Sequence, residues 1–273
     1  MPNSNHFENL KVQFHIETLY RPKLKGLEKE RLISGFRRLA LSSLGEIPEY
    51  QVLTGEDKIL NNSVIAIAYD SNGQMLGFCS SLLLDVDKVG EVLHLGLTCV
   101  SPLARGNGLT HKLTGNVLQK VIIRRPFSKV WVSNVACVLS SLGNVAKHFD
   151  QVYPSPFYSG LPTQTHIQIA KTIDKSFRKE IFISEDAILD EEKFVFRGSV
   201  SNTAFEKSEN ETQYFHRNPL INQYYQQLLN LNAGDEAVQV GSCSLLGFAY
   251  YRLKRLLGLK KKVTPPILTK ELC

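Results

Sequence analysis

The stretch VLHLGLTCVSPLARGNGLT, residues 92–110, decides the fold. Its first nine residues are mostly apolar, which is typical of a central strand. Pro102 ends that strand, and Gly106 and Gly108 precede apolar residues that recur every fourth position from Leu109 onward. The stretch therefore predicts a buried strand, a glycine turn and an amphipathic helix.

Periodicity predicts the elements on either side of this stretch. Apolar and polar residues alternate near the N-terminal end as in a strand, and apolar residues recur at helical spacing after Gly26. Asn72-Gly73 separates two apolar runs and predicts a hairpin. The expected order is a strand from residue 12 that ends before Arg21, a helix 26–44, strands 64–69, 75–79 and 92–100, a helix 109–124, a strand 130–132 and a helix 138–149.

Beyond residue 160 the patterns are weaker. The polar segment 201–211 is rich in Ser, Asn, Glu and Lys, which predicts a mobile loop. The other expected elements are a helix 165–181, a strand 193–200, a helix 221–231 and a strand 237–243.

The charge of the chain is concentrated at one end. The 273 residues include 32 basic and 26 acidic side chains, for a net charge of +6. Residues 237–270 hold seven basic residues and no acidic one, so the remainder, with 25 basic and 26 acidic residues, is close to neutral. A near-neutral body argues against a nucleic-acid partner, because such proteins carry a basic patch within the folded domain.

The apolar runs and the cysteines of the sequence bear on the cellular location of the protein and on metal binding. Neither a membrane-spanning apolar run nor a secretory signal is apparent, so a cytoplasmic location is expected, with membrane association left open. The five cysteines are far apart and none forms a C-x-x-C pair. We therefore expect reduced thiols and no metal site.

The glycine turn at residues 105–110 is the candidate site for chemistry. Glycines at a helix entrance let the backbone approach a ligand, and the unpaired N–H groups and helix dipole there bind phosphate oxygens. The alternative is a turn in which glycine serves geometry alone, and a bare G-x-G pattern favours it. The chain has neither a G-K-[ST] motif nor the third glycine of G-x-G-x-x-G. The choice between a phosphate-binding turn and a purely geometric one therefore depends on the order of the surrounding elements.

Residues 105–109, RGNGL, set after an apolar strand and Pro102, resemble motif A of the GNAT superfamily of acyl-CoA-dependent N-acyltransferases, with the pattern [Q/R]-x-x-G-x-[G/A]. Thr110 stands where the family has Gly or Ala. The element order over residues 12–158 is also that of the family. The resemblance implies an α/β fold with a mixed, mostly antiparallel central sheet flanked by helices, followed by an α+β C-terminal extension.

The resemblance also implies a binding site for coenzyme A. The turn would bind the pyrophosphate, and the end of the preceding strand would bind the pantetheine arm and supply an oxyanion-stabilising N–H. Asn134 matches the asparagine that often opens the family's second motif. The expected binding residues are Cys99, Val100, Arg105, Gly106, Asn107, Gly108, Leu109, Thr110 and Asn134.

Acyl transfer to an amine needs a proton acceptor and a proton donor. His94 aligns with the first histidine of a pair that the arylalkylamine acetyltransferases of the superfamily carry on this strand, and Gly96 stands at the second. Glu91 is the other candidate, because many family members use a glutamate on this strand. The structural alternatives are a buried histidine that bonds a neighbour, and a solvated turn acid.

The usual proton donor of the family is missing. It is often a tyrosine seven residues after the asparagine, and here that position is Ser141. Tyr153 and Tyr158, just beyond the helix, could substitute for it, but their stretch is more simply explained as an aromatic-packed loop. Cys99 and Cys137 lie in apolar runs, which is typical of inert core thiols rather than acyl carriers.

Residues 245–262 combine leucines and aromatic residues with arginines and lysines. As a helix, this segment has an apolar face beside a cationic one, the pattern of a helix that lies on a membrane or docks on a partner. The alternative is a last helix packed on the domain with its lysines in solvent.

Three regions are expected: 1–160, a GNAT-like acyl-CoA-binding N-acyltransferase core; 161–243, which completes the sheet and the acceptor pocket; and 244–273, a basic amphipathic helix and tail. The expected reaction moves an acyl group directly from acetyl-CoA or another acyl-CoA, as co-substrate, to an amine of a small molecule or peptide. The alternative is a non-catalytic descendant of the fold that binds CoA, a partner or a membrane, and Thr110 and Ser141 favour it.

Overall fold

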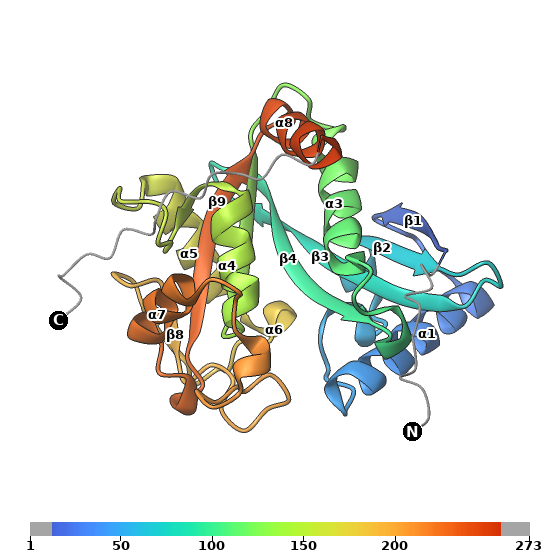
Figure 1. Ribbon diagram of the computed structural model, residues 1–273, viewed down its shortest axis with the longest axis horizontal. Helices are drawn as coiled ribbons and strands as arrows, with labels where there is room; N and C mark the ends of the chain where they lie inside the picture. Colours follow the sequence, from blue (N-terminus) through green and yellow to red (C-terminus); the bar gives the residue numbers. More distant parts are fainter. Residues whose placement is uncertain (1–12, 258–273) are drawn as a thin grey trace, which may run out of the picture.

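A nine-stranded mixed sheet organises the chain, as seen in a computed structural model that describes residues 13–257 (Figure 1). The strand order is β1-β2-β3-β4-β5-β9-β8-β7, and β6 also pairs with β9. Of these pairings, β4 with β5 is parallel and the others are antiparallel. The strands are β1 His15–Tyr20, β2 Ser63–Tyr69, β3 Met75–Val86, β4 Gly90–Val100, β5 Val130–Ala136, β6 Asp150–Tyr153, β7 Ile188–Asp190, β8 Val195–Arg197 and β9 Glu236–Cys243.

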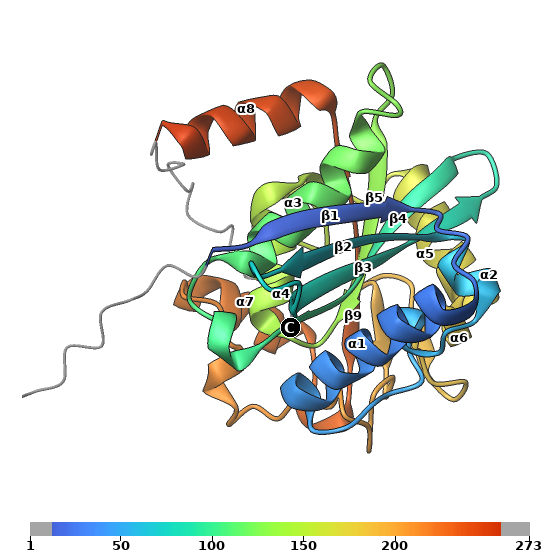
Figure 2. The same ribbon diagram turned by 90° about the vertical axis from the view of Figure 1, so that its right-hand side faces the viewer.

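The helices pack on both faces of this sheet. They are α1 Gly26–Leu44, α2 Asp57–Leu60, α3 Leu109–Ile122, α4 Leu139–His148, α5 Gln164–Ser176, α6 Arg178–Ile181, α7 Pro219–Leu228 and α8 Leu245–Leu256, with a 3-10 turn η1 at Gln51–Leu53. Over the first four strands, α3 covers one face and α1 with η1 covers the other. Over β9, α4 and α7 lie on the α3 side and α5 lies opposite (Figures 1 and 2).

The predicted order of strands and main helices up to residue 149 is confirmed, but the short helix α2 was not expected, and β3 is longer than the expected strand 75–79. The later part differs in detail. The expected helix 165–181 is broken at Phe177, whose backbone leaves the helical region, into α5 and α6. The expected strand 193–200 is shorter because Gly198, at φ +69°, turns the chain after β8. The strands β6 and β7 were not expected, since three or four residues carry little periodic signal.

The C-terminal part is continuous with the same sheet. All seven residues of β5 pair with β9, from Val130 opposite Cys243 to Ala136 opposite Ala237. The polar segment expected to be mobile is held by specific bonds: Cys137 Sγ donates to the Phe205 carbonyl at 3.1 Å, and the Glu206 carboxylate accepts from the Asn202 amide at 2.7 Å.

Two irregularities in the sheet position the site. β4 and β5 are in register only over three pairs, the last being Leu95 opposite Asn134, and then diverge (Figure 1). At the same level β4 has a bulge, since Gly96 and Leu97 together oppose the single residue Ser80 of β3. The bulge therefore lies where the sheet divides into the β1–β4 half and the β5–β9 half.

Candidate acyl-CoA site

The turn between β4 and α3 has the geometry that its glycines predict. Gly106 and Gly108 lie at φ +81° and +64°, the left-handed region that L side chains rarely adopt. Gly108 is the N-cap of α3 and, as a glycine, gives the first turn of that helix no side-chain cap. Asn107 bonds backward instead, from Nδ2 to the Ala104 and Arg105 carbonyls at 3.3 Å each.

This helix start has the properties of an anion site. The N-cap residue Gly108 has no side chain to bond the first N–H groups of the helix, and the helix dipole places partial positive charge there. The side chains of Arg105 and Lys112 are exposed beside it and add positive charge. Thr110 is exposed too, so the side chain that replaces Gly or Ala projects away from the packed core.

The strand end before the turn offers backbone groups. Beyond Leu95, the edge of β4 that faces β5 has no strand partner among residues 13–257. Val100 is half-buried on this segment. Cys99 is buried, and burial raises the pKa of its thiol to about 12, so this cysteine is a core thiol and not a nucleophile at neutral pH.

Gln51 occupies the bulge in β4. This residue of η1 is buried and sits at φ +47°, an uncommon conformation for a residue other than glycine. Its Oε1 accepts from Ser80 Oγ at 2.6 Å and from the Leu97 amide at 3.4 Å. A Cβ on Gly96 would overlap the Gln51 carboxamide, so the bulge admits this side chain only because residue 96 is glycine.

An aromatic cluster and one carboxylate lie between the Gln51 carboxamide and the β5–β9 half of the sheet. The Gln51 Nε2 donates to the Tyr50 hydroxyl at 3.0 Å. The Tyr50 ring lies edge-on to Phe205 at 5.5 Å and to Phe182 at 6.0 Å between ring centroids. Burial raises the pKa of Tyr50, and the nearby charge of Glu236 raises it further, which places that carboxylate close to the phenol.

Glu236 is the buried acid of this region. It is the first residue of β9, it is 7% exposed, and its Oε2 accepts from Ser199 Oγ at 2.6 Å. Burial raises the pKa of Glu236 to about 7, because a carboxylate without a cation loses its hydration there. A carboxyl group that titrates near neutral pH is suited to general base catalysis.

His94 is fully buried on β4, two residues before Gly96. Its Nδ1 lies 3.1 Å from Ser133 Oγ, and burial lowers the pKa of the imidazole to about 3. Its Nε2 is buried and has no hydrogen-bond partner within residues 13–257. A buried polar atom without a partner is rare in proteins, and a polar group of a ligand would satisfy it.

Glu91 does not approach this cluster. Its carboxylate forms ion pairs with Arg21 and Arg125, and its side chain is 14% exposed. It lies at the start of β4, five residues from Gly96, which corresponds to about 17 Å along a strand. The structure thus gives Glu91 the role of joining β1, β4 and the segment after α3.

Asn134 is also held by the core. Its Nδ2 donates to Gln239 Oε1 at 3.1 Å, and Gln239 in turn donates to the Tyr225 hydroxyl at 2.7 Å and to the Leu142 carbonyl at 3.2 Å. This buried network links β5, β9, α4 and α7. The structure therefore holds the Asn134 side chain in this network, at the level where β5 pairs with Leu95 of β4.

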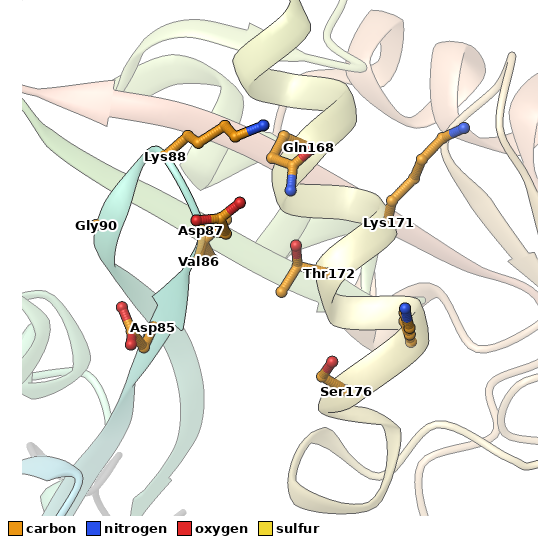
Figure 3. Close-up of a pocket in the computed structure, with 10 residues that line it drawn as sticks. Asp85, Val86, Asp87, Lys88, Gly90, Gln168, Lys171, Thr172 and Ser176 are labelled. Carbon is orange, nitrogen blue, oxygen red and sulfur yellow. The ribbon is translucent and has the colours of Figure 1, made fainter.

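A pocket of about 670 Å³ lies elsewhere, between the β3–β4 turn and α5 (Figure 3). Its walls carry charges of both signs, with Asp87 on the turn and Lys171 on the helix. None of the predicted site residues lines it. Separately, no three His, Cys, Asp or Glu side chains within residues 13–257 are grouped so as to hold a metal ion.

Four residues of this cluster are not predicted by the sequence pattern: Tyr50, Gln51, Ser80 and Glu236. Each comes from a different element or from a segment without periodic pattern, and they meet only through the folded sheet. One signal was available for Glu236: an acid directly before the apolar strand 237–243 is a candidate buried carboxylate.

No family model matches this chain, and no curated protein sequence matches it significantly. Among solved structures, a GNAT-family N-acetyltransferase (YhbS) from Escherichia coli in complex with CoA is similar over 54% of this chain and 73% of its own, with 15% identity and a TM-score of 0.38. A GNAT-family acetyltransferase from Brucella melitensis in complex with acetyl-CoA covers 44% and 75%, with 16% identity and a TM-score of 0.32. A ribosomal-protein-alanine N-acetyltransferase from Brucella melitensis biovar Abortus 2308 covers 45% and 80%, with 19% identity and a TM-score of 0.32.

All three similar proteins are N-acetyltransferases or acetyltransferases, and the first two are named as members of the superfamily that residues 105–109 resemble. The predicted mixed, mostly antiparallel sheet flanked by helices is confirmed by the strand pairing of the chain itself.

Proposed function

We propose that this protein binds an acyl-CoA and transfers its acyl group to an amine, with acetyl-CoA as the first donor to test. One observation carries the proposal: the uncapped start of α3 follows directly on the strand that holds the bulge and the unpaired edge. A pyrophosphate bound at residues 105–110 would leave the pantetheine arm along β4, with the thioester toward Leu97. This arrangement supplies one continuous binding path.

In the proposed reaction the amine nitrogen bonds to the acyl carbon and the carbon–sulfur bond breaks. The ammonium proton passes to an acceptor, and the CoA thiolate takes up a proton. The Leu97 N–H in the bulge is the candidate donor to the oxyanion of the tetrahedral intermediate. Because this N–H donates to Gln51 Oε1 at 3.4 Å, Gln51 has to withdraw before the acyl oxygen can replace it.

We propose Glu236 as the proton acceptor, with His94 as the competing candidate. Glu236 titrates near neutral pH, whereas the lowered pKa of His94 makes the imidazole a weak base. His94 would then act through its unbonded Nε2, as an acceptor for the amine or for a water molecule. Both residues are buried on the face of the sheet opposite α3, which α1, η1 and α5 cover, so the acceptor has to enter between these elements.

The pH dependence of the rate separates these two residues. With Glu236 as base, we expect kcat/KM to rise with pH and to reach a plateau above about pH 7. In Glu236→Gln we expect kcat/KM to be lower by roughly 100-fold and the rise with pH to be lost. With His94 as base, no limb is expected above about pH 4, and His94→Gln lowers the rate instead. An arylamine acceptor is neutral near pH 7, so its own titration does not overlap the limb expected for Glu236.

Binding tests the phosphate turn directly. Isothermal titration is expected to show acetyl-CoA binding, and Gly106→Val to weaken it about 100-fold, equivalent to about 2.7 kcal/mol, because valine is strained at φ +81°. Gly115→Val, within α3 where a Cβ meets nothing within 4 Å, is the matched control and should bind normally. Failure to bind acetyl-CoA or any longer acyl-CoA would contradict the proposal.

A second function is favoured by Gln51. Its carboxamide fills the bulge and bonds the Leu97 N–H, so the structure suits a protein that binds CoA without turnover. Ser141 at the usual tyrosine position agrees with this alternative. CoA binding without thiol release across a panel of amines would support it, and release with any amine would reject it.

A further inference from the structure

One end of the molecule exposes apolar side chains from two segments that are far apart in the sequence. The pairing of Val130 with Cys243 places the loop 123–129, which precedes β5, next to the chain that leaves β9 for α8. Both views show this loop and α8 at the same end of the molecule (Figures 1 and 2). This juxtaposition arises from the sheet and is not evident from the sequence.

We call the exposed apolar residues at this end the distal surface. Phe127 is 101% exposed and Ile123 is 59% exposed in the loop, and Leu246, Leu253 and Leu257 at α8 are 83%, 54% and 62% exposed. Large apolar side chains gathered on one exposed surface mark an interaction site, whereas single ones do not.

One side of α8 packs on the core, and this leaves the leucines on its other side exposed. Leu245 and Phe248 pack against the core beneath α3, which fixes the inner side of the helix. Leu253 and Leu257 follow Leu246 by seven and eleven residues. At the spacing of a helix these three positions lie on one side, which is the outer side of α8. No helix within residues 13–257 is long and apolar enough to cross a membrane, so α8 suits a location in the interface plane.

The charge of this end indicates its partner. Arg124 and Lys129 are exposed in the loop, and Arg252 is exposed on α8. Of the seven basic residues between 237 and 270, Arg252 is the one whose side chain the structure describes; the other six, and the lack of acidic residues in this stretch, are known from the sequence alone. Apolar side chains among basic ones match a bilayer with anionic headgroups, since each nearby Lys or Arg adds attraction to such a surface.

We propose that the distal surface docks this protein peripherally on an anionic lipid bilayer. The outer leucines of α8 and Phe127 enter the headgroup region, and the surrounding arginines and lysines contact lipid phosphates. The sheet end that carries the glycine turn stays on the aqueous side, because Val100 lies near the opposite end of β4 from Gly90. The inference is independent of acyl transfer and does not require the proposed function.

Sedimentation with vesicles tests this surface on the full chain. We expect binding to phosphatidylcholine vesicles that contain phosphatidylglycerol, at least tenfold weaker binding to pure phosphatidylcholine, and a decrease as salt screens the charges. Phe127→Glu and Leu253→Glu should each weaken binding about tenfold. Leu27→Glu, an equally drastic change at a 77% exposed leucine on α1, is the matched control and should leave binding unchanged.

Three results would overturn the proposal. They are absence of binding to anionic vesicles, equal loss of binding in Leu27→Glu, and binding that does not depend on lipid charge. Light scattering addresses a second copy as the occupant: a dimer that is lost in Leu253→Glu, without vesicle binding, assigns the surface to self-association. Thermal melting of each variant verifies that the chain is folded, so that a loss of binding is assigned to the surface.

Discussion

Replacing Glu236 by glutamine is expected to stabilise the protein at pH 8 by up to about 3 kcal/mol and to leave its stability unchanged at pH 4. The amide keeps an oxygen for the 2.6 Å bond from Ser199 Oγ and removes the charge. The free energy of unfolding, from urea denaturation at a series of pH values, is the quantity to measure.

The sign follows from the raised pKa of Glu236, which is about 7 in the folded protein against 4.5 for the free side chain. Between pH 4.5 and 7 the folded protein retains a proton that the unfolded chain has released. The free energy of unfolding therefore falls as pH rises through this window and levels off above it. Glutamine does not titrate, so the variant lacks this loss.

A comparable substitution on the surface controls for the change of residue type. Glu30→Gln, on the exposed side of α1, is expected to alter stability by less than about 0.5 kcal/mol at either pH. A Glu236→Gln variant whose stability follows that of the natural chain at every pH would show that the carboxyl group is hydrated, and would remove it as a base with raised pKa.

Gly96→Ala is expected to lower the free energy of unfolding by about 2–3 kcal/mol. The added methyl would overlap the Gln51 carboxamide, which then has to leave Ser80 and the Leu97 amide. Gln51→Ala alone should cost about 1–3 kcal/mol, because it leaves the buried Ser80 hydroxyl without its acceptor.

The double variant tests whether these two residues act through one contact. With Gln51 removed, the methyl at position 96 has space, so the Gly96→Ala and Gln51→Ala costs should fall short of their sum by at least about 1 kcal/mol. Additive costs would contradict the described contact. Gly115→Ala, in the open middle of α3, is the control for a glycine replacement and should not destabilise.

Thiol release by Gln51→Ala distinguishes the two proposed functions. If Gln51 closes the acyl position, its removal frees the Leu97 N–H and should raise the rate with acetyl-CoA and an amine. If the protein only binds CoA, the variant should bind acetyl-CoA and release no thiol. The comparison is made at pH 8, where Glu236 is ionised and able to accept a proton.

The sequence by itself determined the elements that depend on local pattern. The apolar run 92–100, Pro102 and the glycines at 106 and 108 specified a strand, a turn and a helix, because φ preference and periodicity act over a few residues. The same pattern located the glycine turn at residues 105–110, whose left-handed φ values at Gly106 and Gly108 depend on residue type and not on distant parts of the chain.

Tertiary structure alone decided which side chains meet at the bulge and how each one ionises. Gln51 reaches Gly96 across 45 positions of sequence, and Glu236 reaches the region of Tyr50 only because β9 pairs with β5. His94 and Glu91, both candidate bases in the sequence, differ in the fold: His94 is a neutral buried imidazole, and Glu91 is a largely buried acid paired with two arginines. Burial and the distance to other charges cause these differences, because the free energy of a charged group depends on its surroundings. The residue type alone does not specify those surroundings.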